Sequence, residues 1–185
     1  QRNNPLPPNV GASNAKELVF DLLESSYTVA TAGQKAAGRG RDITFFHGSE
    51  VAFWPNASTH FAASIQAVPY EPGTEIILES TSNGTGGEWY ERCQDAIAKR
   101  GDYELVFIPW FMSPEYQREP EPGFELSDTS AEGEMSELEY ARTFELSLNQ
   151  MAWRRVKIAE LRSSQLFMQE YPATVAESFQ SVGRE

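Results

Sequence analysis

The sequence predicts an α/β protein in which a mainly parallel sheet with flanking helices is followed by a small helical subdomain. Three observations lead to this prediction. Short β-branched and aromatic runs alternate with helical patterns up to about residue 112, only helical patterns follow residue 136, and 40% of the 185 residues are hydrophobic. Strands separated by helices of ten or more residues are typical of βαβ units and a parallel sheet, and this hydrophobic content is enough to build a core.

The first half is expected to begin with an extended segment, residues 1–12, rich in Pro, Asn and Gly. Apolar residues at helical spacing predict helices over 14–24, 56–68 and 89–99, and Ser13 or Asn14 can cap the first. Runs rich in β-branched and aromatic residues predict strands over 27–31, 43–46, 74–79 and 104–110. The loop 32–41 between the first two strands is rich in Gly and basic residues, and a glycine-rich turn, 80–87, follows the third strand.

The second half differs in kind. Residues 113–135, which we call the acidic excursion, are rich in Pro, Glu and Gly and are expected to lie on the surface. Helices are then predicted over 136–144, 148–161, 165–170 and 173–179. In the longest, an apolar stripe runs along one face, while Arg154, Arg155 and Lys157 lie off it. These three cations are predicted contacts to DNA or to an adjoining domain, or else a solvated helix edge.

The net charge of −12 comes mostly from one stretch of the chain. Between residues 115 and 145 there are ten acidic residues and two arginines, a balance of −8, whereas the other 154 residues carry −4. Binding to nucleic acid needs a local positive field, and acidity concentrated in one insertion does not exclude such a field elsewhere.

Several classes of protein are excluded by simple counts. Cys93 is the only cysteine, so an internal disulfide is impossible and a reducing compartment is expected. No apolar run approaches the ~18 residues needed to cross a bilayer, and the N-terminus does not resemble a signal peptide. With only His47 and His60 and no cysteine cluster, no metal site built by the protein is predicted. The chain lacks an initiator Met, and we expect it to be an internal piece of a longer protein.

Polar side chains follow two of the predicted strands. Ser49 and Glu50 come shortly after strand 43–46, and Ser80, Thr81, Ser82 and Asn83 come directly after strand 74–79. Ligands of parallel sheets bind beyond the carboxyl ends of the strands, so Glu50 and Asn83 should share one edge if the two strands are neighbours. A carboxylate that deprotonates water and an amide that senses the terminal phosphate suit the hydrolysis of a nucleoside triphosphate. Taken alone, Glu50 also fits a solvated strand end, and Asn83 fits ordinary turn chemistry.

Residues 33–40 have the two-glycine spacing of a phosphate-binding P-loop, but they do not satisfy its chemistry. Arg39-Gly40 stands in place of Lys-Ser/Thr, and a strand-like run follows in place of a helix. We interpret this segment as a basic surface loop in which Arg39 and Arg41 either contact a phosphate or a neighbouring subunit, or are simply solvated.

Taken in order, these motifs resemble the large terminase subunit of tailed bacteriophages, the motor ATPase that packages DNA into the procapsid. The resemblance spans about residues 5–183. The matching segments are TAG and GRG at 31–33 and 38–40, FHGSEVAFW at 46–54, GTEIILESTSNG at 73–84, LNQMAWRR at 148–155, and FMQEYP with ESFQ at 167–172 and 177–180.

The resemblance implies a RecA-like ATPase core over residues 1–112 that is incomplete at its N-terminus. The acidic excursion and a helical subdomain over 136–185, leading to a linker, would follow. Strand 43–46 would correspond to the Walker B strand, Glu50 to the catalytic carboxylate, and Ser80, Thr81, Ser82 and Asn83 to the coupling motif. ATP and Mg²⁺ would be the substrate and cofactor. The partners would be double-stranded DNA, the portal protein and the small terminase subunit, with a homo-oligomeric ring in the host cell cytoplasm.

Three departures from the family pattern matter. Ser49 stands where the Walker B aspartate is expected, so Mg²⁺ would be held through water by a weaker, neutral ligand. The P-loop and the nuclease carboxylates are absent, and the isolated fragment is expected to hydrolyse ATP poorly or not at all. Two alternatives therefore stay open: a helicase or recombinase ATPase core, and a non-catalytic interaction module derived from such a fold.

Overall fold

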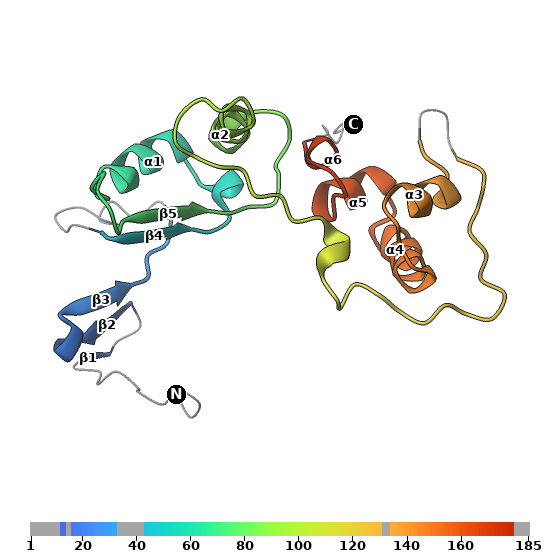
Figure 1. Cartoon of the computed structure of the whole chain (residues 1–185), viewed down its shortest axis with the longest axis horizontal. Coiled ribbons are helices and arrows are strands. Elements are labelled where there is room, and N and C mark those ends of the chain that lie inside the picture. The colour runs from blue at the N-terminus through green and yellow to red at the C-terminus, as the bar shows by residue number, and fades with distance from the viewer. Residues whose placement is uncertain (1–11, 14–15, 33–42, 131–133, 180–185) are drawn as a thin grey trace. The chain divides into compact units, whose positions relative to one another are not determined.

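The computed structural model describes residues 12–13, 16–32, 43–130 and 134–179 (Figure 1). Contacts divide the chain into two compact units. The first unit comprises Gln1–Gly48 and Trp54–Leu78, and the second comprises Ser49–Phe53 and Glu79–Glu185. The predicted basic loop, with Arg39 and Arg41, lies outside the described residues.

The first unit begins with a small antiparallel sheet. Strands β1 (Ala12–Ser13), β2 (Glu17–Phe20) and β3 (Ser25–Thr28) pair in that order, and the 3-10 turn η1 (Asp21–Leu23) joins the last two. Glu24 adopts a left-handed conformation with φ 46°, which reverses the chain so that Phe20 pairs with Ser25.

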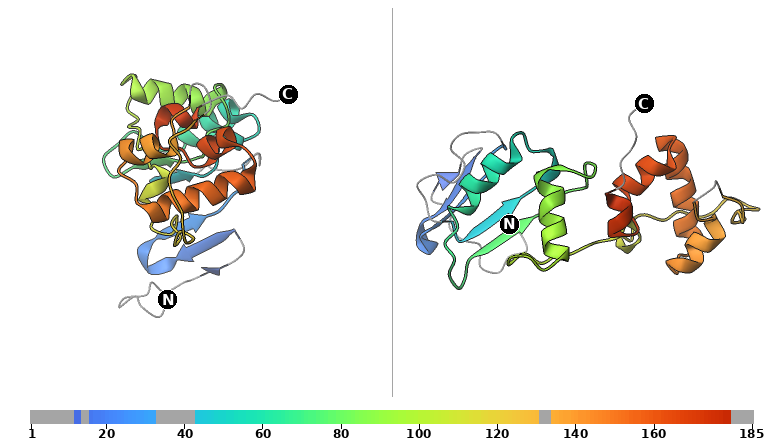
Figure 2. Two further views of the ribbon diagram at one scale, coloured as in Figure 1. Left: turned by 90° about the vertical axis from the view of Figure 1, so that its right-hand side faces the viewer. Right: turned by 90° about the horizontal axis from the view of Figure 1, so that it is seen from above.

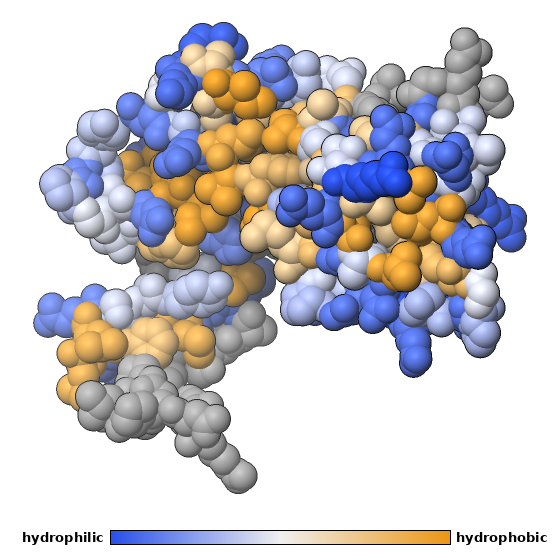
Figure 3. All heavy atoms as spheres, turned by 45° about the vertical axis from the view of Figure 1, so that its right-hand side comes forward, coloured by the Kyte–Doolittle hydropathy of each residue, from blue (hydrophilic) through white to orange (hydrophobic). Residues whose placement is uncertain are grey.

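The helix predicted over 14–24 is therefore wrong for its described residues. The helical spacing of apolar residues is present in the sequence, but the backbone of β2 pairs with β3 instead of forming a helix. Leu22 and Leu23, which would have belonged to the apolar stripe of that helix, are 76% and 63% exposed. Hydrophobic surface is accordingly visible over this hairpin (Figure 3).

The rest of the first unit is a βαβ unit. Strand β4 (Phe45–Gly48) pairs in parallel with β5 (Glu75–Leu78), with His47 opposite Ile77, and α1 (Ala57–Ile65) lies between them in sequence (Figures 1 and 2). Phe61 of α1 is fully buried and stacks on Trp54, with ring centroids 5.3 Å apart. A Cβ at Gly48 would lie 3.0 Å from the Trp54 ring and 3.1 Å from Leu78, so a side chain here would require these two neighbours to shift. The predicted strands 43–46 and 74–79 and the helix 56–68 are confirmed as elements.

The predicted fold class, a RecA-like mainly parallel sheet, is wrong. In the described residues the β-structure consists of the three-stranded antiparallel sheet and the two-stranded parallel sheet. The predicted strand 104–110 does not form. Its side chains alternate as in a strand, with Leu105 and Phe107 half-buried and Val106 77% exposed, but no described strand pairs with it. Alternation of half-buried and exposed side chains shows only that one face of a segment is covered. A β-sheet also needs a second backbone that pairs with the segment by hydrogen bonds.

The second unit is mainly helical, and the bounds of its helices match the sequence prediction closely. Its helices are α2 (Gly87–Ile97), α3 (Glu137–Thr143), α4 (Leu148–Leu161), α5 (Ser164–Glu170) and α6 (Val175–Ser178), with 3-10 turns η2 (Val51–Phe53) and η3 (Trp110–Met112). Side-chain caps explain the agreement. Ser136, Ser147, Ser163 and Thr174 each accept a hydrogen bond from a backbone N–H in the first turn of the helix that follows.

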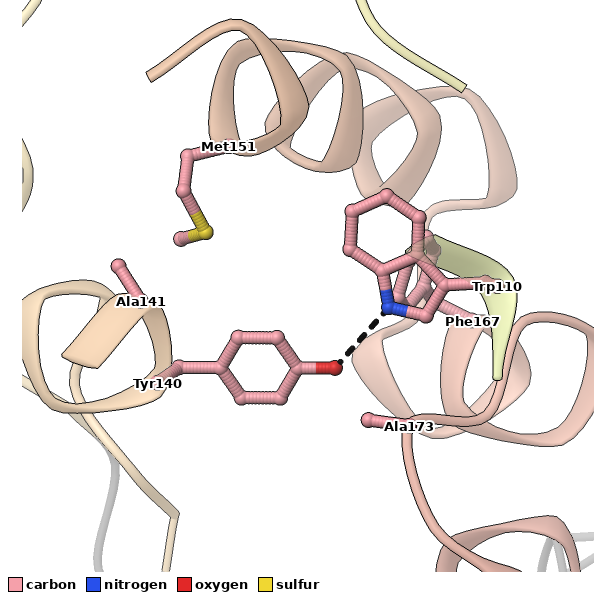
Figure 4. Close-up of a cluster of buried hydrophobic side chains, with 6 residues drawn as sticks. All are labelled: Trp110, Tyr140, Ala141, Met151, Phe167 and Ala173. Carbon is pink, nitrogen blue, oxygen red and sulfur yellow. Dashed lines mark hydrogen bonds between the residues drawn. The ribbon is translucent and has the colours of Figure 1, made fainter. Parts of the chain in front are cut away.

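The core of the second unit is aromatic and contains one buried polar pair. Its buried residues come from η3, α3, α4, α5 and the turn before α6 (Figure 4), and they are Trp110, Tyr140, Ala141, Met151, Phe167 and Ala173. The indole N–H of Trp110 donates to the Tyr140 hydroxyl at 3.2 Å. Trp153 stacks on Trp110 with ring centroids 5.2 Å apart.

The acidic excursion lacks helix and strand in its described residues, yet side chains anchor it to this core. Tyr116 stacks on Trp153 with centroids 4.6 Å apart, and Phe124 and Leu126 pack against the buried cluster. The guanidinium of Arg155 lies 4.1 Å from the Phe124 ring centroid and donates to the Glu125 carbonyl at 2.7 Å. The domain boundaries at 112 and 135 stay a prediction.

Candidate functional site

Two loops that follow β4 and β5 in the chain are joined by hydrogen bonds. We call residues 49–53 the Glu50 loop and residues 79–84 the Asn83 loop. The Val51 N–H donates to the Glu79 carbonyl at 3.2 Å, and the Ala52 N–H donates to the Ser80 hydroxyl at 3.1 Å. The side-chain amide of Asn83 donates to the Ala52 carbonyl at 3.4 Å. The structure therefore joins the two loops, with Ser80 and Asn83 both bonded to Ala52.

Glu50 occupies a special place in its loop. Its φ is 54°, in the left-handed region that non-glycine residues rarely adopt, and its carbonyl accepts a hydrogen bond from the Phe53 N–H at 3.0 Å. The next residue, Val51, is fully buried, while Ser49 and Glu50 are exposed. The buried Val51 directly after Glu50 fixes the backbone of this acid while its side chain is exposed. The left-handed conformation is not special to Glu50, because it also occurs at Glu24, Asn56, Lys99, Glu145 and Arg162.

The Asn83 loop combines a buried residue with exposed polar ones. Ser82 is 5% exposed, whereas Thr81 and Asn83 are exposed. Gly84 has φ 78°, so the Asn-Gly pair forms a turn that needs glycine at its second position. Ser80 is committed to the Ala52 N–H, and its role in the described structure is to hold the two loops together.

The chemistry available on these two loops is that of two exposed carboxylates, Glu50 and Glu79, one amide and several hydroxyls. The described residues contain no group of three or more His, Cys, Asp or Glu side chains that could hold a metal ion. Mg²⁺ commonly keeps several waters and is bound through one or two carboxylates and the phosphates of its substrate. Ser49 and Glu50 fit this mode of binding, and they do not form a cage that would hold the ion without a triphosphate.

The predicted cations of α4 make contacts within the second unit. The guanidinium of Arg154 lies 4.1 Å from the ring centroid of the buried Tyr140. Arg155 binds both carboxylate oxygens of Glu137, and Lys157 pairs with Glu160 at 2.6 Å. Whether any of them also contacts DNA stays a prediction.

Sequence reasoning missed two residues of this region. Val51 anchors the Glu50 loop, and Gln169 on α5 donates from its side-chain amide to the Ser82 carbonyl at 3.4 Å. The apolar character of Val51 between Glu50 and Ala52 was a usable signal for the anchor. Gln169 lies within the segment 167–172 that carries the family resemblance, but no signal pointed to its partner, because that partner is a backbone carbonyl 87 positions away.

No protein-family model matches the chain, and no curated protein matches its sequence. Among the helices of the described ranges, none is both long enough and apolar enough to cross a membrane.

Proposed function

We propose that this chain is part of the ATP-hydrolysing motor of a phage large terminase subunit, which couples hydrolysis to the translocation of viral DNA into the procapsid. The observation that carries the proposal is the hydrogen-bonded pair of loops, with Glu50 exposed on one and Asn83 on the other. The ordered motifs that resemble the terminase family suggest the proposed substrate, ATP, and the proposed translocation of DNA into the procapsid.

In this mechanism Glu50 is the general base. Its exposed carboxylate accepts a proton from the water that attacks the γ-phosphorus of ATP, and ADP leaves as the bond to the β–γ bridging oxygen breaks. Mg²⁺ on the triphosphate supplies charge neutralisation when bound, and Ser49 is the neighbouring hydroxyl that would reach it through water. The amide of Asn83 senses the terminal phosphate, and its exchange between that phosphate and the Ala52 carbonyl would couple phosphate release to loop movement.

The proposed setting is the host cell cytoplasm. There the motor would work as a homo-oligomeric ring on double-stranded DNA, with the portal protein and the small terminase subunit as partners.

The test uses the complete coding sequence that contains these residues. Replacing the catalytic base, Glu50→Gln, should lower kcat for ATP hydrolysis by ~10² or more and leave KM for ATP nearly unchanged. The matched control is Glu91→Gln, because Glu91 is an exposed carboxylate on α2. Turnover by Glu50→Gln at the wild-type rate would reject the assignment of Glu50.

Two further results separate the alternatives. ATP hydrolysis that DNA stimulates but portal protein does not would favour a helicase or recombinase. A wild-type protein that neither binds nor hydrolyses ATP would favour a non-catalytic interaction module.

A further inference from the structure

We propose that Gln169 of α5 is a positioning residue that holds the Asn83 loop, and through it the Glu50 loop, in the arrangement described above. Its effect on turnover rests on the proposed function, whereas its effect on loop position can be measured without any activity.

The first step of the argument is the contact itself. The side-chain amide of Gln169 donates to the Ser82 carbonyl at 3.4 Å, and the same nitrogen donates to the Glu170 carboxylate at 3.3 Å. Ser82 is 5% exposed, so water has little access to this part of the loop. The bond is partly buried, and a partly buried carbonyl that loses its donor suffers some desolvation cost, so this bond matters more than a fully exposed bond of equal length.

The second step follows the hydrogen bonds from Ser82 to Glu50. Ser80, two residues before Ser82, and Asn83, directly after it, bind the Glu50 loop, because the Ser80 hydroxyl accepts from the Ala52 N–H and the Asn83 amide donates to the Ala52 carbonyl. The Val51 N–H adds a bond to the Glu79 carbonyl. A shift of the Ser82 backbone would therefore be transmitted to the residues directly after Glu50.

The third step is the rigidity of the helix that carries Gln169. Phe167, two residues earlier on α5, is fully buried, and its ring packs against Trp110, Trp153 and Tyr171. The turn after α5 is also tied down, because the Pro172 carbonyl accepts from the Trp110 N–H at 3.2 Å. Gln169 therefore reaches the Asn83 loop from a helix that is fixed in the aromatic core, as a positioning residue requires.

The experiment compares Gln169→Leu, which keeps much of the side-chain volume but removes the donor, with Gln165→Leu. Gln165 is exposed one turn earlier on the same helix and serves as the matched control. Amide hydrogen exchange at Val51 and Ala52 is measured in this 185-residue chain. Loss of one hydrogen bond should speed their exchange about threefold to tenfold in Gln169→Leu and leave it unchanged in Gln165→Leu. Exchange at both amides equal to wild type in Gln169→Leu would overturn the proposal.

A second readout concerns catalysis in the complete gene product. Gln169→Leu should lower kcat for ATP hydrolysis about threefold to tenfold with little change in KM, because Gln169 does not touch the substrate. An unchanged kcat beside faster exchange would overturn the catalytic part of the proposal. If the wild-type protein has no ATPase activity, the proposed function fails, and the exchange result alone decides the structural role of Gln169.

Discussion

In the second unit, the pKa of a buried polar side chain depends on the groups that surround it. Glu177 is 8% exposed, and its carboxylate accepts a hydrogen bond from the Ala173 N–H at 2.6 Å. Burial raises the pKa of Glu177, although this hydrogen bond and the nearby Arg154 oppose the shift. Burial, aided by the charge of Glu177, also raises the pKa of Tyr140. Tyr140 therefore keeps its proton and acts as a neutral partner for Trp110.

The Tyr140 hydroxyl provides a prediction at this scale. Tyr140→Phe removes the acceptor of the buried Trp110 N–H and should lower the free energy of unfolding by about 1–3 kcal/mol, the cost of one unpaired buried donor. Chemical denaturation of both proteins measures the difference. Tyr70→Phe is the control, since Tyr70 is 93% exposed. Equal stability of Tyr140→Phe and wild type would show that the indole finds another partner.

Between elements, the decisive contact is the one that joins α3 to α4 and to the acidic excursion. Glu137 on α3 binds Arg155 on α4 and accepts from the Ser127 N–H at 3.0 Å. Burial alone would raise the pKa of Glu137, but the hydrogen bonds from Arg155 and Ser127 and the charges of Arg155 and Arg154 together lower it below its ordinary value of 4.5. The folded state therefore favours the charged carboxylate.

This lowered pKa predicts a pH dependence of stability. Its contribution is fully present above pH 4.5, the ordinary pKa of the group, and is lost as the pH falls through the lower folded pKa. Glu137→Gln should lower the free energy of unfolding by about 1 kcal/mol at neutral pH, with Arg155 partly exposed and screened. The difference from wild type should shrink in urea titrations as the pH falls below 4.5. Glu139→Gln, an exposed change on the same helix, should give no such convergence. A constant difference at all pH values would contradict the role of charge.

At the scale of the whole molecule, the notable feature is where the charge lies. Of the net −12, the stretch 115–145 carries −8, and its acidic excursion is held to the core by Tyr116, Phe124 and Leu126. The packing of these three side chains explains how the acidic excursion holds a single conformation although its described residues form no helix or strand. Its described residues have no backbone ladder, so its structure depends on these side-chain anchors and on the hydrogen bonds of Ser127 to Glu137 and of Arg155 to the Glu125 carbonyl.

Tyr116→Ala tests this dependence. Loss of the stack on Trp153 should free the segment and raise the rate of cleavage by a glutamate-specific protease within 113–130 about tenfold, as expected for an aromatic pair of ordinary strength. Mass spectrometry of the fragments locates the cuts. Tyr70→Ala, at an exposed tyrosine of the other unit, should cleave there at the wild-type rate. Unchanged cleavage in Tyr116→Ala would show that other contacts hold the segment.

The sequence by itself determined the elements whose signals are local. The helix 148–161 was predicted to the residue from the apolar residues that recur along one face, and in the structure Ser147 and Gln150 form a capping box at its start. Glu50 and Asn83 were chosen as candidates from the sequence, because each follows a run that predicts a strand, and their roles stay a prediction. Local sequence patterns are sufficient to predict an element when its backbone hydrogen bonds are formed within the element itself.

Only the tertiary structure decided how backbones pair over longer distances. Residues 17–20 have helical spacing but join a hairpin, and residues 104–109 have strand alternation but lack a described partner strand. The link from Gln169 to Ser82 was equally invisible, because any backbone carbonyl can accept an amide. The physical reason is the same in each case. A β-ladder or a side-chain-to-backbone bond depends on a partner distant in sequence, and composition and periodicity carry no information about that partner.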